Sequence, residues 1–127
     1  ALKWAKAIGG LPALIARASA NAQVVHDFCD ANPWIANLAD NPATASTTSV
    51  CLKFTDPRIT DGEAFAKAVA KRIEKAGAGF DMGAYRDAPP GLRIWCGSTV
   101  ETSDVQDLMP WIAYAFEAEI AALAQAA

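Results

Sequence analysis

The sequence predicts an α+β fold, in which a small, mainly antiparallel sheet has its helices layered on one face. Three observations support this prediction. Apolar residues recur at helical spacing in three long segments, three short segments have the pattern of strands, and no internal repeat or low-complexity segment is present. With 127 residues, of which 53% are hydrophobic, the chain is long enough to form one globular domain with a core.

The first part of the chain, residues 1–32, is expected to be helical. It begins with the helix-like stretch ALKWAKAI, and from Leu11 its apolar residues follow one helical face until Asn32-Pro33 ends the pattern. Residues 34–49 change to a turn-rich connection that contains NPATASTTS. Apolar and polar residues then alternate through VCLKF, residues 50–54, which predicts a half-buried strand.

The middle of the chain is expected to form a second helix and two strands. Asp61 can cap a helix whose apolar residues keep helical spacing until Gly77 stops it. Residues 80–85 and 92–96 have the pattern of two further short strands, separated by RDAPP. With the last segment, the predicted order is helix, strand, helix, strand, strand, helix.

The last segment is predicted to be an amphipathic helix. Thr102 or Ser103 can cap its start, and its apolar residues lie on one face. Pro110 lies past the first turn, where the missing N–H and the ring of a proline disturb a helix. We therefore expect a kink at Pro110 or a helix that begins near Asp107.

The composition excludes several classes of function. A net charge of −3 provides no general attraction for nucleic acid or for an anionic membrane. No window approaches about 18 consecutive apolar residues, and the N-terminus lacks the pattern of a secretion signal, so we expect a soluble, cytoplasmic protein. The three cysteines form no close-spaced pair and His26 is the one histidine. Reduced thiols are therefore expected, and no metal site is predicted.

Other isolated residues have simple explanations. His26 lies beside Asp27 on the first helix, but neighbours in a helix point in different directions, so a surface or hydrogen-bonded histidine is favoured over a catalytic pair. The glycines match no phosphate-binding loop. Core or interface packing is expected for most of the tryptophans, which are Trp4, Trp34, Trp95 and Trp111.

Arg93 is a charge in the middle of the strand predicted at 92–96. By alternation Leu92, Ile94 and Cys96 face the helices, whereas Arg93 and Trp95 face the other side. Residue type alone favours a structural arginine that pairs with an acidic neighbour, and a ligand-binding arginine is the alternative.

Arg86 strengthens the ligand-binding interpretation of Arg93. It lies seven residues earlier, across a Pro-Pro connection that restricts the course of the loop, so the two guanidinium groups could converge at one end of the sheet. Such a pair suits a small dianion or a carboxylate, which arginine binds in a bidentate fork.

Three stretches resemble the C-terminal part of phosphoserine aminotransferases, which are pyridoxal-phosphate enzymes of fold type I. They are GGLPALIARASAN, SVCLKFTDP and YRDAPPGLRIWCGSTVETSDV, and the similarity covers nearly the whole chain. The resemblance implies that residues 1–127 are a single C-terminal small domain, with 1–32 as a linking helical segment. The large cofactor-binding domain is then absent from this sequence, which agrees with the missing initiator methionine.

The family resemblance also implies an activity. Phosphoserine aminotransferases are homodimers that move an amino group between glutamate and 3-phosphohydroxypyruvate in serine biosynthesis, giving 2-oxoglutarate and phosphoserine. The expected partners are these small molecules, the chain's own large domain and a second subunit. The Schiff-base lysine of the family belongs to the large domain, and no lysine of this chain matches its context. We therefore expect no catalytic residue here, no bound pyridoxal phosphate and no transamination by this fragment alone.

The substrate-binding residues implied by the resemblance are Arg93 and Arg86. Gly91-Leu92-Arg93 matches the family segment whose arginine binds the substrate α-carboxylate. The family's His-Arg pair for the substrate phosphate corresponds to Tyr85-Arg86-Asp87, with one extra residue before Arg93. Arg86 is thus a weaker phosphate candidate.

Two alternatives come from other classes of protein. The chain could be a free-standing α+β module that binds a small anion for regulation, using the same two arginines. It could also be an interaction domain whose exposed apolar surface serves association.

Overall fold

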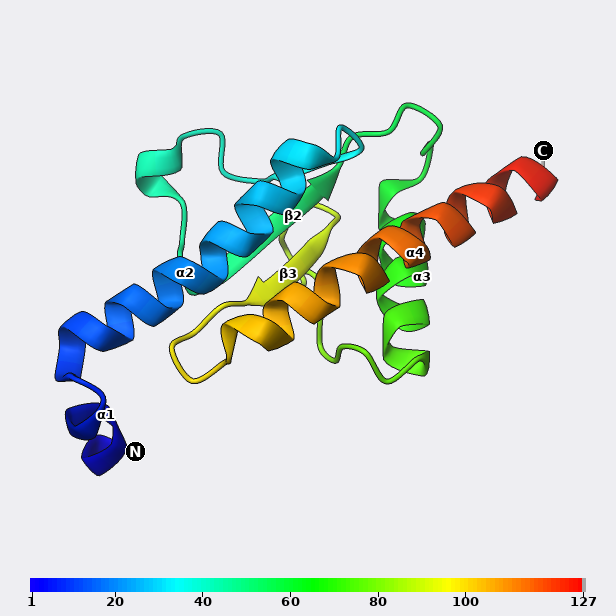
Figure 1. Cartoon of the computed structure of the whole chain (residues 1–127). Coiled ribbons are helices and arrows are strands. Elements are labelled where there is room, and N and C mark those ends of the chain that lie inside the picture. Colours follow the sequence, from blue (N-terminus) through cyan, green and yellow to red (C-terminus); the bar gives the residue numbers. More distant parts are fainter. Residues whose placement is uncertain (127) are drawn as a thin grey trace.

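The computed structural model describes residues 1–126, and Figure 1 shows their arrangement. The elements in chain order are α1 (Leu2–Ala7), α2 (Gly10–Ala31), β1 (Ile35–Asn37), the short 3-10 helix η1 (Pro42–Thr44), β2 (Ser49–Phe54), α3 (Gly62–Lys75), β3 (Leu92–Trp95) and α4 (Thr102–Ala126).

The three strands of residues 1–126 form one antiparallel sheet in the order β1-β2-β3. Ile35 pairs with Phe54 at one end of β1, and Cys51 of β2 pairs with Arg93 of β3. The long helices α2 and α4 lie across one face of this sheet, and α3 packs against α4 (Figure 1). The predicted α+β fold, with helices layered on one face of a small antiparallel sheet, is confirmed.

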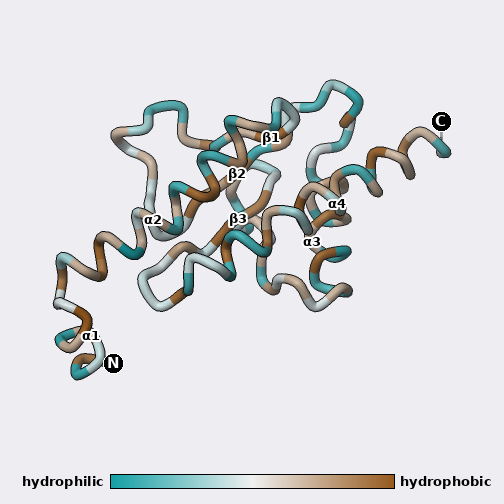
Figure 2. Tube along the Cα trace, in the orientation of Figure 1, coloured by the Kyte–Doolittle hydropathy of each residue, from teal (hydrophilic) through white to brown (hydrophobic). Residues whose placement is uncertain are grey.

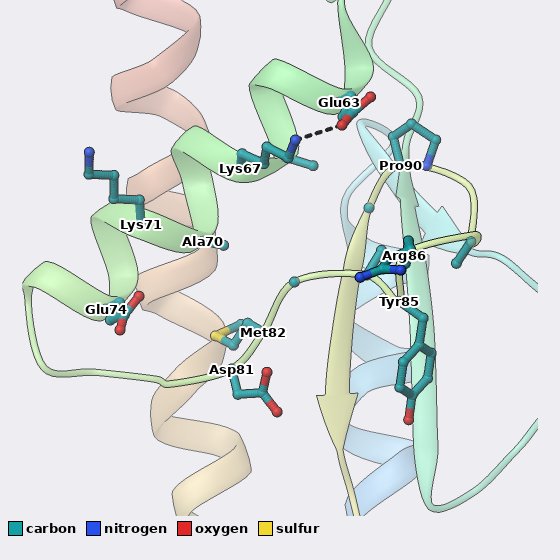
Figure 3. A pocket seen from close by; sticks show the side chains of 15 residues that line it. Glu63, Lys67, Ala70, Lys71, Glu74, Asp81, Met82, Tyr85, Arg86 and Pro90 are labelled. Carbon is teal, nitrogen blue, oxygen red and sulfur yellow. Dashed lines mark hydrogen bonds and ion pairs between the residues drawn. The ribbon is translucent and has the colours of Figure 1, made fainter.

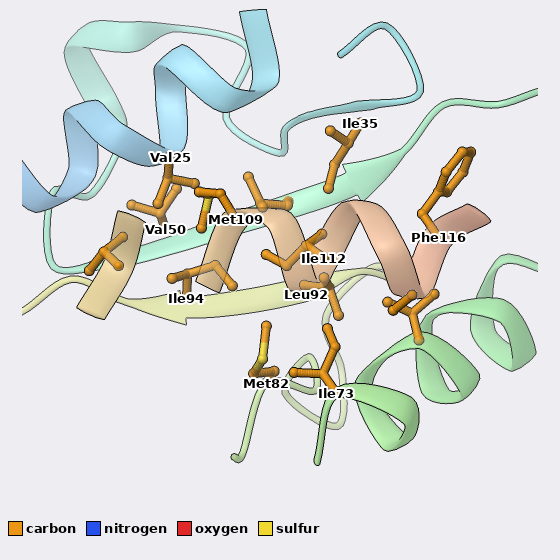
Figure 4. Close-up of a cluster of buried hydrophobic side chains, with 14 of the residues drawn as sticks. Val25, Ile35, Val50, Ile73, Met82, Leu92, Ile94, Met109, Ile112 and Phe116 are labelled. Atoms are coloured by element: carbon orange, nitrogen blue, oxygen red, sulfur yellow. The ribbon is translucent and has the colours of Figure 1, made fainter. Parts of the chain in front are cut away.

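The core lies between the sheet and its helices, because alternate strand residues point to that side. Figure 4 shows side chains of β2 and β3 meeting those of α2 and α4. An aromatic stack extends the core, with the rings of Trp34 and Phe116 at a centroid distance of 3.9 Å. Buried residues from the packed elements include Val25, Val50, Leu52, Ile73, Leu92, Ile94, Ile112 and Phe116.

Two segments differ from the strands expected from the sequence. β1 lies within the stretch that was predicted to be a turn-rich connection, and its three residues are too few to show alternation. Residues 80–85 form no strand and contribute an isolated bridge between Gly83 and Leu92. Asp81 has a left-handed backbone with φ of 52°, which interrupts an extended chain, so the strand prediction for 80–85 is wrong.

The helix boundaries test the predicted caps. Asp61 caps α3 as expected, because its carboxylate accepts a hydrogen bond from the backbone N–H of Ala64 at 2.9 Å. α4 begins at Thr102 and continues through Pro110, so a start near Asp107 is wrong. Burial of Met109 and Ile112 on either side of Pro110 holds this helix in place despite the missing N–H.

Large apolar side chains remain exposed at the N-terminal end. Leu2 and Trp4 on α1 and Leu11 and Ile15 on α2 are exposed. Figure 2 shows hydrophobic colour along α1 and the start of α2, which project from the sheet. Trp95 and Trp111 are also exposed, so core packing holds for Trp34, and interface packing stays a prediction for the other three tryptophans. Within the described residues, no helix combines the length and apolar character that a membrane crossing requires.

Candidate functional site

Arg93 projects from the open face of the sheet, opposite the helices. Leu92 and Ile94 on either side of it are buried, as alternation predicted. The backbone on both sides of β3 fixes its position, since Arg93 pairs with Cys51 of β2 and donates its N–H to the carbonyl of Met82 at 2.8 Å. The strand is therefore a rigid base for the guanidinium group.

The guanidinium group of Arg93 is held by two residues of the 81–85 segment. Its Nη2 donates to the carboxylate of Asp81 at 2.7 Å and to the Asp81 carbonyl at 3.1 Å. The ring of Tyr85 lies 4.6 Å from Cζ, in a cation–π contact. The bond to Asp81 raises the pKa of Arg93 above its ordinary value, so the group stays charged.

A second nitrogen of the Arg93 guanidinium group, Nε, is buried and has no hydrogen-bond partner. The whole side chain is 14% exposed, whereas that of Asp81 is 88% exposed. Buried donors nearly always have an acceptor in folded proteins, so an unpaired one requires an explanation. An acceptor supplied by a ligand is one such explanation.

Two cavities flank the 81–85 segment. One of about 420 Å³ is lined by Arg93 and Trp95 of β3, together with Asp81 and residues at the start of α4. The other, of about 730 Å³, lies between α3 and the loop that leads to β3 (Figure 3). Asp81 and Met82 line both cavities.

Arg86 lines the larger cavity with Lys67 and Lys71 of α3. Figure 3 shows its side chain and that of Tyr85 leaving the loop in different directions. Arg86 and Arg93 therefore do not share one cavity, and the expected convergence of the two arginines is not what the structure shows. Lys67 is neutralised in part by Glu63, which accepts its hydrogen bond at 2.6 Å.

Asn21 is a residue of this region that the sequence analysis missed. It is fully buried in α2, and its Nδ2 donates to the carbonyls of Cys96, Gly97 and Val100 at 3.1 to 3.3 Å. Its Oδ1 accepts from the hydroxyl of Thr102 at 2.7 Å. This amide thus fixes the turn between β3 and α4, and Thr102 uses its hydroxyl there rather than as a cap.

Arg17, one helical turn before Asn21, binds the same turn. It donates to the carbonyl of Ser98 at 2.8 Å and forms an ion pair with Glu101 at 2.8 Å. The sequence signal for Asn21 was its place among apolar residues such as Ala18 and Val25 on one helical face. A polar residue on a buried face requires hydrogen-bond partners, but the sequence does not name them.

The lysines of the described residues lie on the surface. Lys53 pairs with Asp40 at 3.0 Å and Lys67 with Glu63, and no lysine lines the cavity beside Arg93. Residues 1–126 also contain no group of three or more side chains suited to hold a metal ion. His26 lies at 3.1 Å from the Asn37 amide and is therefore a hydrogen-bonded residue.

Comparisons with known proteins agree with the resemblance seen in the sequence. The chain is 44% identical over 117 residues to the phosphoserine aminotransferase of Methanosarcina barkeri and 42% identical over 116 residues to that of Methanosarcina mazei. Both alignments cover 91% of this chain, which spans 30% of the length of each relative. No family model matches the chain.

A solved structure supports the fold. A phosphoserine aminotransferase chain, studied for radiation damage of its Schiff base, superposes with a TM-score of 0.76 at 18% sequence identity. The match covers 91% of this chain and 30% of the solved one. The predicted similarity to phosphoserine aminotransferases is therefore confirmed by sequence, and the solved structure confirms the fold.

Proposed function

We propose that this chain, which is homologous over 91% of its length to phosphoserine aminotransferases, is the C-terminal small domain of such an enzyme. Residues 1–32 would link it to a large domain, and their exposed apolar side chains on α1 and α2 support a surface that is covered in the whole enzyme. No observation favours the alternative of a free-standing anion-binding module.

The proposed reaction of the whole enzyme is transfer of an amino group between glutamate and 3-phosphohydroxypyruvate, in cytoplasmic serine biosynthesis by a homodimer. Pyridoxal phosphate, bound by the large domain, would supply the electron-withdrawing ring on which the amino group is transferred. We infer that the cofactor is anchored outside the site of Arg93, because no lysine of the described residues lines the cavity beside that arginine. We therefore assign this domain a role in binding and orienting the substrate.

Arg93 is proposed to bind the α-carboxylate of the substrate. The observation that supports this role is a charged donor on a rigid strand whose Nε is buried without a protein acceptor. A planar guanidinium grips a carboxylate with two parallel hydrogen bonds, and this fixes the orientation of the attached carbon. Holding the substrate in this way aligns its α-carbon for reaction.

Arg86 is proposed to contribute to binding of the substrate phosphate. Its cavity also contains Lys67 and Lys71, so the wall carries several positive charges. Glu63 and Glu74 lie in the same wall and reduce this positive character. Arg86 is therefore a weaker site residue than Arg93.

Replacing Arg93 in the full-length enzyme tests the proposed function. We expect Arg93→Ala to raise the substrate KM and to lower kcat/KM by about two orders of magnitude, because a bidentate charged contact is lost. Arg58→Ala is the matched control, since Arg58 is an exposed arginine that pairs with Asp56 outside both cavities. Unchanged kinetics for Arg93→Ala would show that this arginine is structural.

A further inference from the structure

One of the two donors on the edge of the Arg93 guanidinium that faces Asp81 has no hydrogen-bond acceptor. In arginine Nε and Nη2 lie on one edge and can bind both oxygens of a carboxylate in parallel. Asp81 accepts from Nη2 at 2.7 Å, whereas Nε is buried without an acceptor. The internal carboxylate thus makes one of the two hydrogen bonds that this edge can form.

Asp81 is also free to leave. Its side chain is 88% exposed, so the released carboxylate would be hydrated rather than buried. Ion pairs that involve such exposed groups are weak. The Asp81 carbonyl, at 3.1 Å from Nη2, and the Tyr85 ring would still contact Arg93 after the carboxylate had moved.

The backbone of Asp81 supports a specific role for this residue. Its φ of 52° lies in the left-handed region, which is unfavourable for residues other than glycine and is best tolerated by asparagine and aspartate. Strained backbone of this kind is often found where a side chain has a functional task. Here the conformation places a carboxylate against the charged group of the site.

We propose that Asp81 is an internal occupant of the carboxylate-binding edge of Arg93, which the substrate carboxylate displaces. The inference rests on the proposed function of Arg93. In the empty protein Asp81 keeps the guanidinium oriented. Since the substrate must replace it, Asp81 lowers the apparent affinity for substrate by the fraction of molecules in which the pair is closed.

A role of Asp81 as a simple anchor for Arg93 predicts a change in KM of the opposite sign to the one that displacement predicts. If Asp81 only positioned Arg93, its loss would leave the guanidinium mobile and raise KM. If Asp81 competes with the substrate, its loss lowers KM. The sign of the change therefore separates the two roles.

The test is Asp81→Asn in the full-length enzyme, because asparagine tolerates the left-handed backbone and removes the charge. We expect KM for 3-phosphohydroxypyruvate and for glutamate to fall about three- to fivefold with kcat unchanged, since an exposed ion pair is worth up to about fivefold in an equilibrium constant. Asp81→Gly, which also suits this φ, should change KM in the same direction.

Asp104→Asn is the matched control, because Asp104 lines the same cavity and forms no ion pair with Arg93 within the described residues. It should change KM by less than about twofold, since surface charges act weakly over such distances. An equal fall in KM for both variants would overturn the proposal and assign the effect to net charge.

The Arg93→Ala enzyme separates failure of this inference from failure of the proposed function. Unchanged kinetics of Arg93→Ala would show that Arg93 does not bind the substrate carboxylate, and the proposed function would then be wrong. A large loss of kcat/KM with Arg93→Ala, together with an unchanged or raised KM for Asp81→Asn, would overturn only the inference that substrate displaces Asp81. The proposed role of Arg93 would stand. In the double variant, we expect Asp81→Asn to give no gain over Arg93→Ala, because the shared partner is missing.

Discussion

Gly91 lies so close to Leu52 that a β-carbon at position 91 would fall 1.8 Å from the Leu52 carbonyl oxygen. That oxygen belongs to the backbone of β2, which is held between β1 and β3 and cannot move aside. Gly91 therefore allows the chain to enter β3 directly against β2. The register that pairs Cys51 with Arg93 depends on this approach.

Gly91→Ala should destabilise the chain by about 3 kcal/mol, because an overpacked contact with backbone forces the strands apart. Urea denaturation measures the free energy of unfolding. Gly83→Ala is the control, since no atom lies within 4 Å of a β-carbon built there, and it should change stability by less than about 1 kcal/mol. Equal effects of the two substitutions would contradict the importance of the Leu52 contact.

Asn21→Ala should cost about 2 to 3 kcal/mol, because it leaves the Thr102 hydroxyl and three backbone carbonyls without their buried partner. The measurement is the same denaturation experiment. Gln23→Ala serves as control, since its amide bonds Asp27 on the exposed side of the same helix, and it should cost less than about 0.5 kcal/mol. A loss for Asn21→Ala as small as that of the control would disprove the proposed fixing of the turn.

Arg86→Ala in the full-length enzyme should change KM for phosphoserine and KM for glutamate to different extents. If Arg86 contacts the phosphate, KM for phosphoserine rises about tenfold, because a charge-assisted hydrogen bond is lost, while KM for glutamate changes little. Steady-state kinetics with each amino donor measure this difference. Arg93→Ala should raise both values, and a parallel rise with Arg86→Ala would assign Arg86 to another role.

The thiol of Cys29 should react slowly with iodoacetamide at neutral pH. Burial, together with the nearby charge of Asp30, raises its pKa to about 11. The raised pKa keeps the thiol protonated below that pH, so the reactive thiolate is scarce. The alkylation rate, followed by mass spectrometry of the labelled peptide, should increase about tenfold per pH unit between pH 7 and pH 9. A plateau below pH 9 would show an ordinary or lowered pKa.

Burial likewise raises the pKa of Cys96 to about 11, and its inaccessible side chain should be labelled still more slowly than that of Cys29.

The regular elements with long apolar patterns were predictable from the sequence. The ends of α2, β2, α3 and β3 lie within one or two residues of their expected positions. Each element buries apolar residues at a regular spacing, which the sequence shows directly. β1 was missed since three residues show no repeat. At 80–85 the apolar pattern was misleading, because Phe80 and Tyr85 are exposed and Met82 alone of the three is buried.

The candidate site was predictable in part. Strand alternation placed Arg93 on the open face, and the acidic neighbour that residue type suggested is Asp81. The identity of that neighbour depends on how the 81–85 segment folds back along β3, which no local pattern encodes. The cavity that Arg86 lines was not predictable for the same reason, since the direction of a loop side chain depends on tertiary contacts with α3.

The division of β3 into two faces has a consequence for how this sequence can diverge. Leu92 and Ile94 are constrained by core volume, so substitutions there are limited to side chains of similar size and shape. Arg93 and Trp95 point away from that core, so we expect their replacement to leave its packing intact. Successive positions of one strand are therefore subject to separate selection, one set for folding and the other for recognition. Ligand preference can evolve on this strand without a new core.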